Sequence, residues 1–131
     1  MSATLYSLSI DAQAIPEPQI VDYCEVVTLP SNFEGKVLSV EAILVPGEHS
    51  LSLFGLTCLQ LGYNRITAAI LPSDWLSLRN AKKLSKILQH HHSAKVNVVG
   101  MFESDKGPYG PDGDRFQFTI SEIRSVSMLS N

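Results

Sequence analysis

Residues 79–101, RNAKKLSKILQHHHSAKVNVVGM, contain the change of periodicity that decides the fold. In the first half, apolar side chains recur at three- and four-residue spacings, which place them on one face of a helix, opposite the lysines. That apolar face is formed by Ala81, Leu84, Ile87, Leu88 and His91. From Val96 onward the spacing falls to two, which is typical of a strand. The stretch therefore predicts an amphipathic helix followed by a strand.

Further strands are expected on both sides of this helix. They are predicted at residues 37–44, 50–58, 65–71 and 115–121. Pro46-Gly47 marks the first turn, Pro72-Ser73-Asp74 supplies side chains that can cap a helix start, and residues 106–113 form a long turn. In the last strand we expect Phe116, Phe118 and Ile120 to face inward. A change of phase at Ile123 indicates a bulge or bend.

The expected order of three strands, one helix and two strands is that of the OB-fold, a mainly β class. This fold is a five-stranded barrel with one helix between its third and fourth strands, and closure of the barrel hides the sheet edges. Here Leu84, Ile87 and Leu88 are expected to cover the bottom of the barrel. A split α+β sandwich has the same coarse order and remains an alternative.

One domain, residues 19–131, is expected after an N-terminal arm, residues 1–18. The arm ends in Pro16 and Pro18, which favour extended backbone before them, and it has a possible strand at Thr4–Ile10. Residues 19–29 carry apolar side chains at a helical spacing. Their β-branched residues suit a strand equally well.

Composition and charge exclude several classes of protein. The 131 residues are 44% hydrophobic and 18% charged, which excludes a disordered chain, and no apolar run reaches the length of a membrane span. The net charge of −3 argues against a protein that binds nucleic acid or anionic membranes over its whole surface. No signal peptide is recognised at the start, so a cytoplasmic location is expected. Cys24 and Cys58 are expected as free thiols, with a bridge between them as the alternative.

Two segments resemble a known group of proteins. Cys24-Glu25-Val26-Val27 and residues 30–42, PSNFEGKVLSVEA, are similar to small, uncharacterised bacterial proteins with an OB-fold-like barrel. In these a cysteine-led helical turn precedes the pattern Pro-x-x-aromatic-x-Gly-Lys-x-Val-x-Val-x-Gly. Their later features correspond to Cys58, residues 96–102 and Tyr109-Gly110. The resemblance implies a barrel and assigns no chemistry. Ala42 and Pro111 replace a glycine and a histidine that are frequent in the group, so no ligand or metal role of that histidine carries over.

The charges are unevenly distributed along the chain. Residues 75–95 contain five cations and no acid, whereas the rest of the chain has a net charge of −8. The cations on the expected helix are Arg79, Lys82, Lys83 and Lys86. They form either a solvated helix face or a site for an anionic partner. The 106–113 loop, with Lys106 and Tyr109, is a second candidate contact surface, because binding loops are often carried by rigid barrels.

Motifs for catalysis, metals and cofactors are not recognised. His90-His91-His92 cannot converge on one ion within a helix, and Asp105, Asp112 and Asp114 do not have the spacing of a calcium loop. Ser50 beside His49 and Glu48 lies at a turn and not in a nucleophile elbow. We therefore expect no enzymatic activity, no metal and no cofactor.

The sequence thus predicts a binding module, and three hypotheses follow. The first is a protein partner with an acidic surface, bound by Arg79, Lys82, Lys83, Lys86, Lys106 and Tyr109. The second is single-stranded nucleic acid, bound through Phe54 and Arg65 on the usual face of the fold. The third is an exported accessory domain with a Cys24–Cys58 disulfide. A homo-oligomer is compatible with all three.

Overall fold

A computed structural model describes residues 17–48, 50–58, 65–70 and 78–129. The first half of the described chain contains β1 (Gln19–Ile20), α2 (Tyr23–Thr28), the 3-10 turn η1 (Pro30–Asn32), β2 (Val37–Pro46), β3 (Leu51–Phe54) and β4 (Ile66–Ile70). The second half contains α3 (Ala81–Gln89), β5 (Ala94–Glu103) and β6 (Gln117–Met128).

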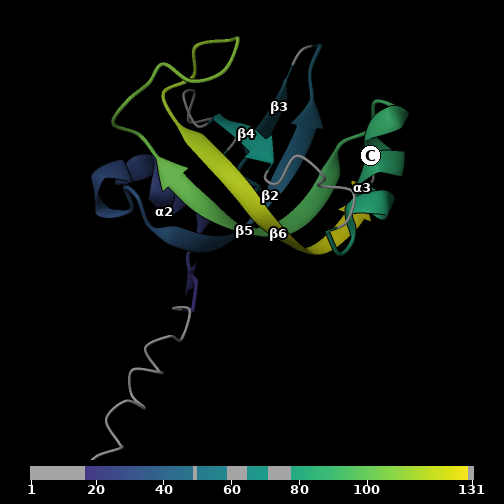
Figure 1. Ribbon diagram of the computed structural model, residues 1–131, viewed down its shortest axis with the longest axis horizontal. Helices are drawn as coiled ribbons and strands as arrows, with labels where there is room; N and C mark the ends of the chain where they lie inside the picture. The colour runs from purple at the N-terminus through teal and green to yellow at the C-terminus, as the bar shows by residue number, and fades with distance from the viewer. Residues whose placement is uncertain (1–16, 49, 59–64, 71–77, 130–131) are drawn as a thin grey trace, which may run out of the picture.

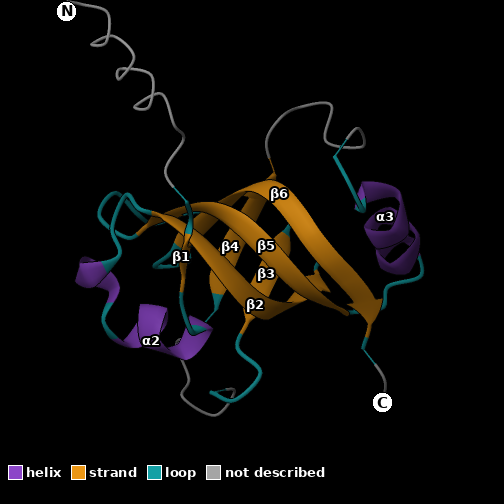
Figure 2. Ribbon diagram, turned by 90° about the horizontal axis from the view of Figure 1, so that it is seen from below, coloured by secondary structure: helices purple, strands orange, loops and turns teal. Residues whose placement is uncertain are grey.

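Strands β2 to β6 close into a barrel (Figure 2). The strand order is β1-β2-β3-β4-β6-β5, and β5 pairs back onto β2. The β4–β6 pair is parallel, whereas β2–β3, β3–β4, β5–β6 and β2–β5 are antiparallel. Because α3 lies between the third and fourth barrel strands, the prediction of a mainly β, OB-fold-like barrel is confirmed. The alternative of a split sandwich does not fit a closed sheet.

The predicted alternation fills the inside of the barrel. Along β2, Leu38, Val40, Ala42 and Leu44 are buried. Phe116, directly before β6, and Phe118 and Ile120 within it are buried as well. The β5–β6 register shifts twice, between Asn97 and Val98 and between Val99 and Gly100, so the predicted irregularity is present. Ile120, Ile123 and Val126 are all buried although they are three residues apart and not two. The register shifts allow these side chains to face the inside of the barrel.

Helix α3 covers the barrel with the residues that the sequence predicted. Leu84 is fully buried, and Ile87 and Leu88 pack against the core. Asn80, which precedes the helix, donates side-chain hydrogen bonds to the carbonyl oxygens of Ile123 (2.9 Å) and Arg124 (3.1 Å) on β6. The start of α3 is therefore attached to the barrel. The predicted cap at residues 72–74 lies outside the described residues.

His91 is a correction to the predicted helix face. The helix ends at Gln89, and His91 is exposed in a left-handed conformation with φ of 60°. The backbone N–H groups of His91 and His92 donate to the carbonyl oxygens of Leu88 and Ile87, which ends the helix with a turn. The apolar face therefore stops at Leu88.

The segment before the barrel combines both of its predicted conformations. Gln19 and Ile20 pair in parallel with β2, and the helix is confined to Tyr23–Thr28. The Asp22 carboxylate accepts a hydrogen bond from the Glu25 backbone N–H at 3.2 Å and so caps α2. The strand predicted at 50–58 is shorter, with β3 ending at Phe54. Of the arm, only Glu17 and Pro18 are described, so the possible strand at Thr4–Ile10 lies outside the described residues.

The two cysteines form a disulfide, which corrects the expectation of free thiols. The Cys24–Cys58 bond joins α2 to the segment after β3. Beside it, a Cβ at Gly55 would collide with the Cys58 sulfur and the Tyr23 ring, so only glycine fits there. The Tyr23 hydroxyl donates to the Leu53 carbonyl oxygen at 2.7 Å. Burial, with a smaller effect of the Asp114 charge, raises the pKa of Tyr23.

Reduction of the disulfide is expected to lower the free energy of unfolding by about 3–4 kcal/mol, because the bond closes a loop across 34 positions. Urea unfolding with and without a thiol reductant measures this difference. The double variant Cys24→Ser, Cys58→Ser is the control, since its stability should not respond to the reductant. Equal stability of the oxidised and reduced wild type would contradict the predicted role of the bond.

Candidate functional site

The loop between β5 and β6 is held in a defined shape by its own backbone. Tyr109 and Asp114 pair across it, with N···O distances of 2.9 and 2.8 Å, and the Gly113 N–H donates to the Gly110 carbonyl oxygen at 3.2 Å. The Lys106 N–H donates to the Tyr109 hydroxyl oxygen at 2.8 Å. The loop is therefore a fixed surface, as a binding loop on a rigid barrel requires.

Asp114 anchors the base of this loop to β4. Its side chain is 6% exposed. The carboxylate accepts hydrogen bonds from Arg65 Nε at 2.7 Å and Thr67 Oγ1 at 2.6 Å, and it has a second contact with the Arg65 guanidinium. A buried carboxylate needs such partners, because burial without them is costly. From the sequence, Asp114 was excluded from a calcium loop and no contact was predicted for it. The sequence did indicate that Asp114 is buried, because it lies two residues before Phe116 and so falls on the same inward-facing side of the alternating pattern as Phe116 and Phe118.

Two predicted site residues make structural contacts within the protein, although the Arg65 side chain is 41% exposed. The Tyr109 side chain is buried under the loop, so its ring offers little area to a partner. Arg65, predicted for the nucleic-acid face, has its charge compensated by Asp114. Phe54, the other residue of that face, is half-buried at the end of β3 opposite Ile43. Lys106 is exposed, as predicted.

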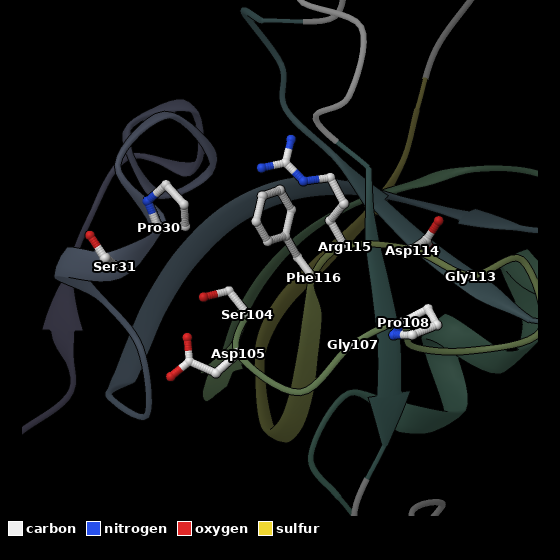
Figure 3. A pocket seen from close by; sticks show the side chains of 10 residues that line it. All are labelled: Pro30, Ser31, Ser104, Asp105, Gly107, Pro108, Gly113, Asp114, Arg115 and Phe116. Carbon is white, nitrogen blue, oxygen red and sulfur yellow. The ribbon is translucent and has the colours of Figure 1, made fainter.

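A pocket of about 490 Å³ lies beside the loop (Figure 3). The Arg115 guanidinium lies over the Phe116 ring, 5.0 Å from its centre, and Asp105 forms the facing wall. Near it the Ser104 hydroxyl donates to Glu34 Oε1 at 2.7 Å. The remaining lining residues are Pro30, Ser31, Gly107, Pro108, Gly113 and Asp114. An apolar floor between a cation and a carboxylate can accept a polar segment of a partner.

Helix α3 presents the basic face that the sequence predicted. Lys82, Lys83 and Lys86 are exposed on it, and Arg79 is exposed just before the helix. None of the three lysines forms an ion pair or hydrogen bond with another described residue. Lys82, Lys83, Ser85, Lys86 and Gln89 surround a shallow hollow of about 540 Å³, which is largely apolar because lysine stems line it. We call these four cations and this hollow the basic helix face.

The basic helix face and the 106–113 loop lie at different ends of the barrel. Figures 1 and 2 share their horizontal axis, and in both α2 and α3 lie at opposite ends of it. The pocket places the loop next to Pro30 and Ser31, which directly follow α2. The predicted contact residues therefore form two separate surfaces, not one continuous site.

The described residues contain no group of three or more His, Cys, Asp or Glu side chains that could hold a metal ion. His90 and His92 are exposed, with ring centres 6.5 Å apart. In the part of the chain that is described, no helix has the length and apolar character needed to cross a membrane.

Asp114→Asn is expected to destabilise the protein by about 2–4 kcal/mol. The substitution removes the negative charge that pairs with Arg65, and the new side-chain amide group places a hydrogen-bond donor against the Arg65 donors. The matched control is Asp112→Asn, an exposed position with one long contact of 3.4 Å to Ser50, which should change stability by less than about 0.5 kcal/mol. Urea unfolding of the two variants measures both effects. A loss at Asp114 no larger than that at Asp112 would show that the buried contacts do not hold the loop.

Comparison with known proteins identifies no family. No family model matches the chain, and neither the curated proteins nor the solved structures contain a significant match. The resemblance to small bacterial barrel proteins therefore stays a prediction.

Proposed function

We propose that this protein is a non-enzymatic binding module that holds an acidic protein surface against the basic helix face. The observation that carries the proposal is the exposure of Arg79, Lys82, Lys83 and Lys86 on a chain whose net charge is −3. No acidic residue occurs between positions 75 and 95, so no neighbour in the sequence neutralises these cations.

The position of the lysines on α3 suits binding. Because they have no ion pair with another described residue, a partner does not need to break internal contacts before it binds. Leu84 and Asn80 attach the helix to the barrel, so little backbone ordering is needed on association. The clustered positive charge increases the rate of encounter with an acidic surface. This increase becomes smaller as the salt concentration rises, because salt screens the attraction.

A protein partner is favoured over single-stranded nucleic acid. Proteins that bind single strands combine stacking aromatic side chains with available cations in one groove. On the corresponding face here, Arg65 is paired with buried Asp114 and Phe54 is half-buried. Lys82, Lys83 and Lys86, which have no ion pair with another described residue, lie on α3 and not on this face.

The disulfide favours an oxidising compartment as the place where the module acts. Disulfides persist in secreted and periplasmic proteins and are rare in the cytosol. The Cys24–Cys58 bond thus supports the hypothesis of an exported accessory domain and opposes the cytoplasmic expectation. The intact mass of protein from its native source, alkylated before purification, tests this. A mass without alkyl groups supports export, and two added alkyl groups contradict it.

Fluorescence anisotropy with a labelled polyglutamate peptide and a labelled single-stranded oligonucleotide tests the proposed partner class. We expect the peptide to bind more tightly than the oligonucleotide at matched charge, and Lys82→Glu with Lys86→Glu to weaken peptide binding at least about tenfold at low salt. The control is Lys36→Glu with Lys106→Glu, which changes the net charge equally but away from α3.

The outcomes separate the hypotheses. Peptide binding that the control variant weakens as much as the α3 variant would remove the basic helix face from the proposal. Tighter binding of the oligonucleotide, with a steep dependence on salt, would replace the protein partner with nucleic acid.

A further inference from the structure

We infer that the acidic partner of the basic helix face is a second copy of this chain, which docks through the acidic pocket beside the disulfide. This inference rests on the proposed function and names the partner for the same face. The observations are a pocket with carboxylates and no lysine or arginine in its lining, a complementary cluster of lysines on α3, and the location of α2, which forms one wall of the pocket, at the opposite end of the molecule from α3.

The acidic pocket has a volume of about 530 Å³ and lies between α2 and the outer side of β2 and β5. Three carboxylates line it, those of Asp22, Glu25 and Glu41. The other lining residues are Ile20, Val21, Tyr23, Cys24, Ser39, Leu56, Thr57 and Asn97. The only cation within ion-pair distance of these carboxylates in the described residues is Lys95, 3.8 Å from Glu41. The pocket therefore has acceptors for more than one incoming ammonium group.

The wall of this pocket is fixed before a partner arrives. Asp22 caps α2, and the disulfide holds Cys24 of the same helix to Cys58. At its base, the buried Ser39 hydroxyl donates to Asn97 Oδ1 at 3.2 Å. A preformed acidic pocket of this kind suits a lysine side chain, whose ammonium group is a compact charge on a flexible stem.

The apolar parts of the two surfaces also correspond. Beside the carboxylates, Ile20 is 83% exposed and Leu56 is 36% exposed. On α3, the stems of Lys82, Lys83 and Lys86 line a hollow that is mostly apolar. Docking would bring these apolar groups together while each lysine tip meets a carboxylate, which adds burial to the charge attraction.

The arrangement of the two faces determines the kind of assembly. α2 and α3 lie at opposite ends of the long axis (Figure 1), and no described carboxylate forms an ion pair with the α3 lysines, so the lysines of one copy are available to the pocket of another. Contacts of a basic face with an acidic face are heterologous, so an open chain of any length keeps one free basic face and one free acidic face at its ends. The expected species are short head-to-tail chains or closed rings, and not a symmetric dimer.

Sedimentation velocity of the oxidised, full-length wild type tests for this assembly. We expect the mean sedimentation coefficient to rise with protein concentration, and the association constant to fall at least about tenfold between about 20 mM and about 300 mM sodium chloride. A wild type that remains monomeric at every concentration in low salt would overturn the inference.

Two blocked variants show which faces meet. The first, Lys82→Glu with Lys83→Glu and Lys86→Glu, loses the basic face and keeps the acidic pocket. The second, Asp22→Asn with Glu25→Gln and Glu41→Gln, keeps the basic face and the helix cap, because asparagine caps helices about as well as aspartate. Each variant alone should be monomeric. Their mixture should form a one-to-one complex that grows no further, since each member has one working face.

The mixture also distinguishes this inference from the proposed function. A one-to-one complex in the mixture supports head-to-tail docking, whereas no complex in the mixture overturns it even if the wild type self-associates. If polyglutamate binds the basic helix face but the mixed variants do not associate, the proposed function stands and the partner is a different acidic protein. If neither occurs, both fail. Circular dichroism and thermal unfolding of each variant verify that it is folded.

Discussion

The parallel pairing of β4 with β6 is the constraint on which the rest of this structure depends. It brings together strands that are about fifty residues apart, from Thr67–Gln117 to Ile70–Ile120, and it converts an open sheet into a barrel. Asp114, which lies just before the start of β6, reinforces the pairing, because its buried carboxylate bonds to Arg65 and Thr67 at the start of β4. The Thr67 N–H also donates to the Phe116 carbonyl oxygen at 3.0 Å. The contacts of Thr67 therefore hold both the closed barrel and the base of the 106–113 loop.

Closure also determines which charges remain available for binding. Arg65 would be a cation for nucleic acid on an open edge, but in the closed barrel it neutralises Asp114. The lysines of α3 neutralise no described carboxylate. The helix is attached to the barrel through Leu84 and Asn80, and its lysines are exposed. The disulfide fixes α2, with its carboxylates, at the other end of the barrel. A molecule with a basic end and an acidic pocket results from these local constraints.

The fold could be predicted from the sequence because its signals are local. The helix with Leu84, Ile87 and Leu88 and the alternating strands with Leu38 or Phe118 show their periods within about ten residues. The site was predicted less completely, because it depends on contacts across the chain. Asp114 meets Arg65 across 49 positions, and Cys24 meets Cys58 across 34, and no local pattern specifies such pairs. Tyr109 was expected to expose its side chain to a partner, because it belongs to a loop. It is inside because the turn folds its ring back onto Lys106.

The most direct measurement of the central claim, closure through β4 and β6, is the set of nuclear Overhauser contacts in isotope-labelled protein. The parallel register predicts contacts between Ala68 and Phe118 and between Ile70 and Ile120, with slow amide exchange along both strands. Absence of these contacts, together with fast exchange in β4, would mean an open sheet. Arg65 would then be free to bind a partner, and the argument that assigns binding to α3 would be contradicted.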